Sequence, residues 1–151
     1  MKPFHEIDLT DFSDVSFRTA FQMYFEELGI RVQNWDGLFR EIQEGENSAF
    51  LHVNEEGQVI GFLLFTTIRM KSWFFEEDCG FLREFWIAPE HRSEGHGAAL
   101  LDRTEEHFRL QGIHRILLTT DTAPGFYEKN GYSQAPGIQS KNGDPVFQKQ
   151  I

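Results

Sequence analysis

The chain has 151 residues and a formal net charge of −10 at pH 7, and 40% of its residues are hydrophobic, including 16 phenylalanines. This length and supply of bulky apolar side chains predict a single folded domain, residues 1–151, and exclude a disordered chain. The acidic balance argues against sequence-independent binding of nucleic acid, because a phosphate backbone requires a basic surface.

The sequence also lacks the patterns of membrane, secreted and zinc-binding proteins. No apolar run has the length of a membrane span, and the start of the chain has no apolar stretch typical of a secretory signal. The single cysteine, Cys79, excludes an internal disulfide, and no cysteine or histidine cluster has the spacing of a structural zinc site. We therefore expect a soluble cytoplasmic protein without a metal.

The first third of the chain predicts a strand and two helices. The strand covers Phe4–Leu9, and an apolar stripe at helical spacing then predicts a helix that ends at Gly29. Its candidate N-caps are Asp11, Ser13 and Asp14. A shorter helix follows, capped by Asn34 or Asp36. Trp35, in the link between the helices, is expected to be exposed and is a candidate for lining an acceptor site.

Two further strands are expected over residues 49–53 and 59–68, joined by a turn that ends at Gly57. Residues 69–80 are expected to form a longer connection. It carries three adjacent aromatic side chains, those of Trp73, Phe74 and Phe75. Such side chains need cover from a partner, a second copy in a homodimer or a bound substrate, unless an extended strand buries them. We favour burial by an extended strand.

The next segment combines a strand, a glycine-rich turn and a helix. The apolar strand 82–88 stops at Pro89, and a helix starts at Ala98. The turn between them, Arg92–Gly97, lets several N–H groups and the positive end of the helix dipole converge on one point, which favours an anion. Its spacing fits neither a P-loop nor a dinucleotide fingerprint.

The last third of the chain predicts a second strand next to the first and a short helix. Gly112 ends the long helix, and residues 113–119 form the next, parallel strand. Phe126-Tyr127-Glu128-Lys129 then precedes a glycine and an aromatic residue, and a final strand covers 146–151. This order of elements predicts a mixed α/β or α+β sheet rather than a doubly wound one.

Two of these segments resemble motifs of the GCN5-related N-acetyltransferases, the GNAT superfamily. Arg92–Gly97 matches the pyrophosphate-binding pattern of Gln or Arg, two residues, Gly, one residue, then Gly or Ala, and Phe126–Lys129 is similar to the second motif. The resemblance implies an acyl-CoA N-acyltransferase fold, with a mostly antiparallel sheet of six or seven strands and about four helices. It also implies that strands 82–88 and 113–119 splay apart to admit the pantetheine arm of acetyl-CoA, the co-substrate.

The resemblance further implies which residues bind the cofactor, with the N–H of Ile87 holding the acetyl carbonyl. The candidates are Phe85, Trp86, Ile87, Arg92, Ser93, Glu94, Gly95, His96, Gly97, Ala98, Thr120 and Phe126. Two of them depart from the common pattern. Glu94 puts a negative charge into the loop, which leaves the backbone cradle intact if its side chain points outward, and Thr120 stands where relatives have asparagine.

Acetyl transfer to an amine requires a base, a polarised thioester carbonyl and an acid for the departing thiolate. Tyr127 is the candidate acid by its place in the second motif, with packing of the short helix as the alternative. Glu84 is the candidate base, because a carboxylate in an apolar strand needs a partner or a raised pKa. A salt bridge to a neighbouring strand is the alternative. Arg83 is expected on the opposite face, and Glu90 is the second choice of base.

The predicted function is an acetyl-CoA-dependent N-acetyltransferase that acts on a primary amine of a small molecule by direct attack in a ternary complex. A small cationic acceptor suits the sequence, because acidic residues gather away from the basic stretch 91–115. Two alternatives stay open: acetylation of a peptide or protein amine, and a noncatalytic acyl-CoA-binding module. No nucleic acid or membrane partner is expected.

Overall fold

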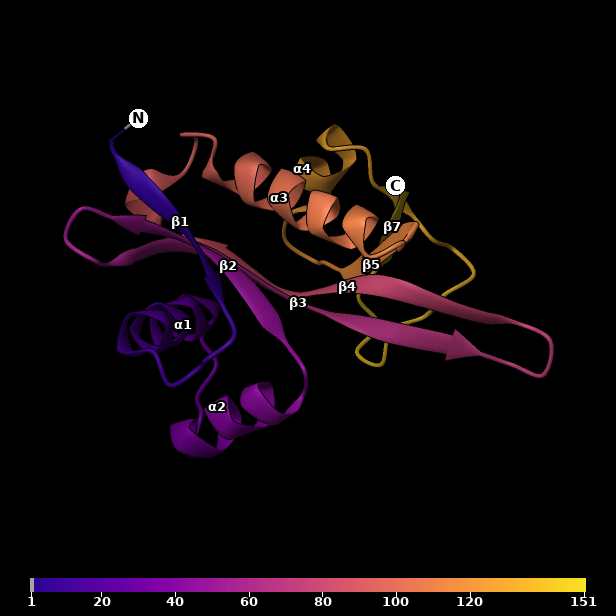
Figure 1. Cartoon of the computed structure of the whole chain (residues 1–151), viewed down its shortest axis with the longest axis horizontal. Helices are drawn as coiled ribbons and strands as arrows, with labels where there is room; N and C mark the ends of the chain where they lie inside the picture. Colours follow the sequence, from indigo (N-terminus) through magenta and orange to yellow (C-terminus); the bar gives the residue numbers. More distant parts are fainter. Residues whose placement is uncertain (1) are drawn as a thin grey trace.

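The computed structural model describes residues 2–151, and seven strands form its single sheet. The strands are β1 (Phe4–Leu9), β2 (Ser48–Asn54), β3 (Val59–Lys71), β4 (Glu76–Ile87), β5 (Arg115–Thr119), β6 (Ser133–Gln134) and β7 (Val146–Gln150). They lie in the order β1-β2-β3-β4-β5-β7-β6 (Figure 1). Only β4 and β5 pair in parallel, so the predicted mixed, mostly antiparallel sheet is confirmed.

Four α-helices cover the two faces of this sheet. They are α1 (Val15–Leu28), α2 (Trp35–Glu44), α3 (His96–Leu110) and α4 (Pro124–Lys129). Helices α1 and α2 lie on one face, over a core that includes Phe62 and Trp86, and α3 and α4 lie on the other, over a core that includes Leu63 (Figure 1). Within residues 2–151, none of the helices combines the length and the apolar character that crossing a bilayer requires.

The helix ends follow the local chemistry of the sequence. The side chain of Asp14 accepts a hydrogen bond from the N–H of Phe17 at 2.9 Å, and Asn34 caps α2 in the same way. Gly29 ends α1 in a left-handed conformation, with φ 74°. Helix α3 starts at His96, two residues earlier than Ala98, because the left-handed Gly95 is its N-cap.

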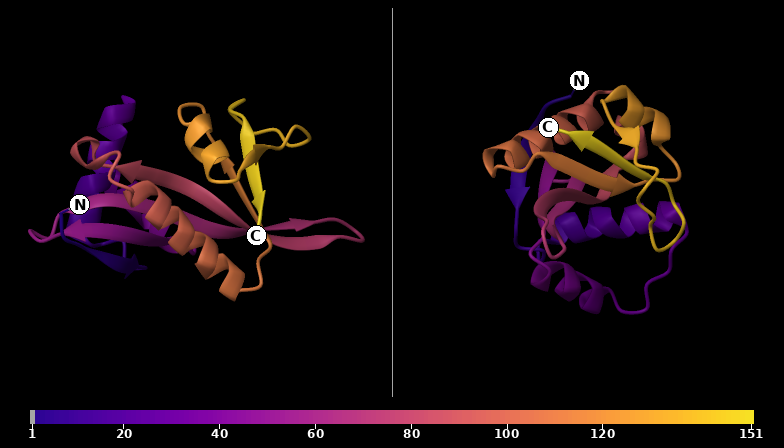
Figure 2. Two further views of the ribbon diagram at one scale, coloured as in Figure 1. Left: turned by 90° about the horizontal axis from the view of Figure 1, so that it is seen from above. Right: turned by 90° about the vertical axis from the view of Figure 1, so that its right-hand side faces the viewer.

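The β3–β4 hairpin is longer than expected, and its tip is uncovered. The predicted connection 69–80 is mostly strand, and the turn is closed by the Ser72 N–H, which donates to the carbonyl of Phe75 at 2.7 Å. Trp73 is 95% exposed and Phe74 97% exposed, so the expectation that an extended strand buries them is wrong. The hairpin projects past the neighbouring strands and helices, so nothing among residues 2–151 covers its tip (Figure 2).

Strands β4 and β5 separate immediately after they meet. They pair only at Gly80 with Ile116 and at Phe81 with Leu117. From Leu82 onward β4 pairs with β3 alone, while β5 pairs with β7 on its other side. The two parallel strands therefore diverge, as the family resemblance implied, and leave an opening in the sheet next to the glycine-rich turn.

Candidate functional site

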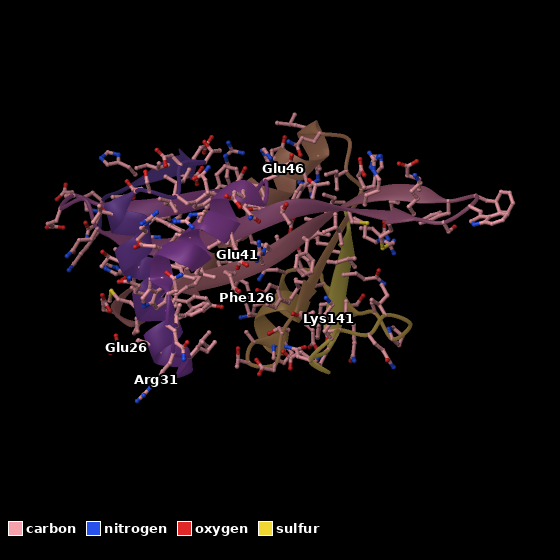
Figure 3. The ribbon with its side chains drawn as sticks, turned by 90° about the horizontal axis from the view of Figure 1, so that it is seen from below. Glu26, Arg31, Glu41, Glu46, Phe126 and Lys141 are labelled. Carbon is pink, nitrogen blue, oxygen red and sulfur yellow. The ribbon has the colours of Figure 1, made fainter. Side chains whose placement is uncertain are left out.

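A cleft of about 450 Å³ occupies the opening between β4 and β5. Its lining includes Tyr24, Glu84, Phe85, Thr120, Asp121 and Tyr127. The cleft thus joins β4, the end of β5, α4 and the C-terminal half of α1. Figure 3 shows this side of the molecule, with Phe126 between Arg31, which follows α1, and Lys141, in the loop before β7.

Glu84 faces the cleft from β4, and its partner is a hydroxyl group. The hydroxyl of Tyr24, on α1, donates a hydrogen bond to the Glu84 carboxylate at 2.5 Å. Among residues 2–151 no cation lies within salt-bridge distance of this carboxylate, so the structure does not contain the alternative salt bridge. Burial raises the pKa of Glu84 above its ordinary 4.5, although the Tyr24 hydrogen bond and the charge of Arg83 act in the opposite direction.

Arg83 does not lie opposite Glu84, as simple strand alternation predicted. Leu64 pairs with Glu84 whereas Phe65 pairs with Leu82, so Arg83 is the extra residue of a β-bulge in β4. Its guanidinium donates to the side-chain oxygen of Asn47 at 3.1 Å, on the face that α1 and α2 cover. The bulge interrupts the alternation of side chains and brings Arg83 to the same side of the sheet as Glu84.

Tyr127 reaches the cleft from α4. Its ring packs against Phe85, Phe126 and Tyr132, with ring centroids 6.4, 5.3 and 5.7 Å away. Within residues 2–151 its hydroxyl has no hydrogen-bond partner. Burial, followed by the nearby charge of Glu84, raises the pKa of Tyr127 well above the ordinary value of 10.0. The phenol therefore keeps its proton at neutral pH and can give it to a stronger base.

Part of the β4 backbone is open to the cleft. The N–H of Ala88 donates to the carbonyl of Ile60, on β3, at 2.8 Å. Because N–H groups alternate in direction along a strand, those of Phe85 and Ile87 point away from β3, toward the edge that β5 does not reach. The side chain of Trp86 points elsewhere: it is 4% exposed and lies in the core beneath α1, outside the cleft.

The glycine-rich turn presents a second group of free N–H donors. Ser93 and Gly95 have positive φ, 68° and 93°, and within residues 2–151 the N–H groups of residues 93–95 donate no hydrogen bond. The first N–H groups of α3, from His96, Gly97 and Ala98, have no intrahelical acceptor. Such an array, with the positive end of the helix dipole, is an anion site. The ring of Phe126 bounds this anion site on one side. It packs so close to Gly97 that a Cβ on residue 97 would lie 3.3 Å from the ring.

Comparison with known proteins identifies the family. Residues 6–132 match the sequence model described as the acetyltransferase (GNAT) family. The chain belongs to this family. An amino-acid acetyltransferase of Ectopseudomonas mendocina is 35% identical over 105 residues, which cover 69% of this chain and 22% of that protein. An uncharacterised N-acetyltransferase of Bacillus subtilis is 25% identical over 115 residues, covering 71% of this chain and 73% of that protein.

Solved structures of GNAT acetyltransferases share the fold. A predicted acetyltransferase of Clostridium acetobutylicum, crystallised with acetyl-CoA, superposes with a TM-score of 0.76 at 17% identity and covers 91% of this chain and 95% of that one. N-acetylglutamate synthase of Neisseria gonorrhoeae, with coenzyme A and N-acetyl-glutamate, gives 0.70 at 15% identity and covers 97% of this chain and 35% of that one. The family and fold predictions are confirmed. The chain spans 22–29% of the length of the amino-acid acetyltransferases that it matches.

Two charged side chains of the GNAT loop are engaged within the protein. Arg92 donates to the carbonyl of Ile87 at 2.9 Å and pairs with Glu27 at 2.7 Å. The Glu94 carboxylate turns inward, between His91 and His96, at 3.6 and 3.5 Å. The condition that its side chain points outward is therefore not met, because two imidazoles lie on the inner side of the loop.

The remaining candidates are distributed between the cleft and the rest of the molecule. The hydroxyl of Thr120 lies at the cleft and accepts the N–H of Ala123 at 3.2 Å, which supports the start of α4. Glu90 is exposed in the turn after β4 and does not line the cleft. Trp35 is half-buried against Phe25 and Phe39, so its expected exposure is wrong.

Sequence reasoning missed Tyr24, which supplies the hydrogen bond to Glu84, and Asp144, which adds a carboxylate to the cleft. Tyr24 looked like a member of the apolar stripe of α1, and it lies 60 residues before Glu84. Its phenolic hydroxyl at the end of that stripe is the one signal in the sequence, since a buried tyrosine hydroxyl usually finds a polar partner. For Asp144, in a loop, there is no comparable signal.

Proposed function

We propose that the chain transfers the acetyl group of acetyl-CoA to a primary amine of a small molecule, by direct attack within a ternary complex. Membership of the GNAT family supports acetyltransferase activity with acetyl-CoA as the co-substrate. The small acceptor, the ternary complex and the roles of individual residues are argued from the geometry of the cleft.

The observation that carries the proposal is that Glu84 and Tyr127 face one cleft from different elements, β4 and α4. Glu84, with its raised pKa, takes a proton from the ammonium, directly or through water. The amine nitrogen then attacks the thioester carbon, and the N–H of Ile87 stabilises the charge on the carbonyl oxygen. When the carbon–sulfur bond breaks, the thiolate takes the proton of Tyr127, and the resulting phenolate takes the second proton that the nitrogen loses as it becomes an amide. Glu84 then releases the first proton to solvent.

The charges around the cleft favour a cationic acceptor. Its lining includes the carboxyl groups of Glu84, Asp121 and Asp144 and one guanidinium, that of Arg83. A surplus of carboxylates attracts an ammonium group and supports its binding before it loses a proton. Amino acids are the first acceptor class to examine, because relatives up to 35% identical are named amino-acid acetyltransferases.

Thiol release from acetyl-CoA, measured with the purified chain and a panel of amines, tests the proposal. The panel contains amino acids, polyamines, amino sugars and short peptides. The proposal predicts thiol release with at least one small amine and a matching acetylated product by mass spectrometry. Acetylation of peptides alone would support the peptide alternative instead. Binding of acetyl-CoA without thiol release across the panel would support the noncatalytic module.

A further inference from the structure

Three buried polar atoms on the glycine-rich turn converge on one point. They are Nδ1 of His91, Oε2 of Glu94 and Nε2 of His96, and none has a hydrogen-bond partner within residues 2–151. One ligand atom of each of the three residues lies within 4.8 Å of those of the others, and Oε2 of Glu94 is 3.6 Å from Nδ1 of His91 and 3.5 Å from Nε2 of His96. His96 is 1% exposed, so bulk solvent does not reach its side chain to supply the missing partner.

A chain of hydrogen bonds behind His96 determines which of its nitrogens is free. Nδ1 of His96 lies 2.8 Å from Nδ1 of His52, and Nε2 of His52 lies 3.4 Å from the carboxylate of Glu6. A carboxylate only accepts, so the neutral His52 donates from Nε2 and accepts at Nδ1. His96 therefore carries its proton on Nδ1.

The free nitrogen of His96 then faces another acceptor. Its Nε2 has a bare lone pair directed at the carboxylate of Glu94, and two acceptors at 3.5 Å repel each other unless a cation lies between them. A histidine whose second nitrogen is held by a hydrogen-bonded partner is also the usual form of a metal ligand. Glu6 is fixed in turn by Arg103, 3.2 Å away.

We propose that His91, Glu94 and His96 bind a divalent transition-metal ion, with Zn²⁺ as the best fit, and that this ion fixes the turn in its anion-binding conformation. Two nitrogens and one carboxylate oxygen form a ligand set that zinc accepts, with a fourth position left open. Ligands about 2.1 Å from a tetrahedral ion lie roughly 3.4 Å apart. The two distances to Glu94 match this spacing, whereas the ligand atoms of the group are up to 4.8 Å apart, so binding would draw the two histidines closer together.

The ion also accounts for a negative charge in a loop that receives a diphosphate. Without a cation, the Glu94 carboxylate lies beside the free N–H groups of residues 93–97 and opposes an anionic ligand. A bound divalent ion reverses the sign of the local charge. Metal and coenzyme A are then expected to strengthen each other's binding, a coupling that rests on the proposed function, whereas metal binding alone does not.

The sequence analysis excluded a structural zinc site because no cluster of cysteines or histidines has the spacing of zinc ligands. This cluster escapes that criterion, because a carboxylate supplies one ligand and His52 and Glu6, which orient His96, come from distant strands. The side chains of His91 and Glu94 are 13% and 30% exposed, which gives an ion a path to the site.

Zinc titration of the full chain, stripped of metal with a chelator and measured against a chromophoric zinc indicator, tests the site. We expect one bound Zn²⁺ per chain and a higher melting temperature with zinc. Glu94→Gln and His91→Asn are expected to weaken binding by more than about 100-fold, beyond the effect of residues that only orient a ligand. His114→Asn, at an exposed histidine outside the cluster, is the matched control and keeps wild-type affinity.

Circular dichroism establishes that the variants are folded, and Co²⁺ provides a second readout. Replacing zinc with Co²⁺ is expected to give the intense visible absorption of a tetrahedral ion, which His91→Asn abolishes. Zinc binding that Glu94→Gln and His91→Asn leave unchanged would overturn the site. The site would also be overturned if wild type bound no zinc at micromolar concentration. A proton, rather than a metal ion, would then lie between Glu94 and His96. Neither readout involves coenzyme A or an amine, so failure here is distinct from failure of the acetyltransferase proposal.

Discussion

Glu84 and Tyr127 owe their proposed roles to their surroundings rather than to their identities alone. Each is shielded from water at one cleft, and burial shifts both pKa values upward. For Glu84 this moves a carboxylate toward the range of a useful base, and for Tyr127 it preserves a neutral donor. The strand places one group and the short helix places the other.

Replacing Tyr127 with phenylalanine separates chemistry from packing. The change keeps the ring that packs against Phe85 and Tyr132 and removes the proton donor. We expect kcat to fall by roughly 10²–10⁴-fold, the range for loss of a general acid, with little change in KM for acetyl-CoA. Steady-state thiol release measures both. Tyr132→Phe is the control: it loses a hydrogen bond to Glu105 away from the cleft, so stability falls while kcat is kept. An unchanged kcat in Tyr127→Phe would remove that residue from the mechanism.

The pH dependence of kcat/KM tests Glu84 as the base. Activity requires the carboxylate, so the rate falls on the acid side as pH drops through the Glu84 pKa, which lies above 4.5. Tyr24→Phe removes a hydrogen bond that favours the charged form, so it raises this pKa and moves the acid limb to higher pH. Glu84→Gln is expected to lose the limb together with most of the activity. An acid limb at the same pH in wild type and Tyr24→Phe would exclude Glu84 as the titrating group.

Glu84→Gln should also reveal a conflict between activity and stability. Because burial raises the pKa of Glu84 in the folded state, the fold is more stable when this carboxyl group is protonated. This extra stability is fully present at pH values below the ordinary pKa of 4.5. That stability is lost as pH rises through the folded-state pKa. Glutamine stays neutral and still accepts from Tyr24, so at pH 7 the variant is expected to melt at a higher temperature than wild type. A lower melting temperature would indicate a structural role for the carboxylate.

At the scale of elements, the cleft depends on where β4 and β5 part. Gly80 lies at this point, opposite Ile116, and α3 packs directly over it through the ring of Phe108. A Cβ at residue 80 would lie 2.6 Å from that ring, and Phe108 is only 1% exposed, so the ring has little room to move.

Gly80→Ala is therefore expected to destabilise the fold by about 1–3 kcal/mol, the usual effect of overpacking a core. Urea unfolding measures the free energy. Gly137→Ala is the matched control, because a Cβ there meets nothing within 4 Å and its φ is not left-handed. Equal unfolding free energies for the two variants would show that α3 is not tightly packed on the start of the opening.

Element types were predictable wherever the signal is local. Asp14, Asn34 and Gly29 mark helix ends through chemistry within a few residues, and the predicted first two helices follow them. Gly95 was not recognised as an N-cap, so the predicted start of α3 at Ala98 is two residues late. The bulge at Arg83 was not predictable, because it arises from a shift of pairing against β3 that no residue of β4 signals by itself. The strand extension over residues 69–80 was favoured from the sequence, but the exposure of Trp73 and Phe74 at its tip was not, because cover by neighbouring elements is a tertiary contact.

At the scale of the whole molecule, the tip of the β3–β4 hairpin is the part that does not pack against the hydrophobic core. Trp73 and Phe74 contribute exposed apolar surface and no burial, so Trp73→Ser with Phe74→Ser is expected to change the free energy of unfolding by less than about 0.5 kcal/mol. Thermal melting checks this, with size-exclusion chromatography alongside. A larger loss of stability would mean that the tip is covered in solution.

The candidate site was predictable in part because its motifs are continuous in the sequence. The loop 92–97 and the segment 126–129 indicated an anion cradle and a short helix next to it; Tyr127 lines the cleft, and Gly97 lies against Phe126 beside it. Partners brought in by the fold were not predictable. Tyr24 reaches Glu84 across 60 residues and His52 reaches His96 across 44, and no local pattern encodes either contact.

A crystal structure of the chain with coenzyme A tests most directly whether the diverging strands form the acetyl-CoA site. We predict that the diphosphate accepts hydrogen bonds from the N–H groups of residues 93–97. The pantetheine arm should run between β4 and β5, with its sulfur near the Tyr127 hydroxyl and the N–H of Ile87. A diphosphate bound elsewhere, or an opening filled by protein with the sulfur remote from Tyr127, would contradict the proposed site.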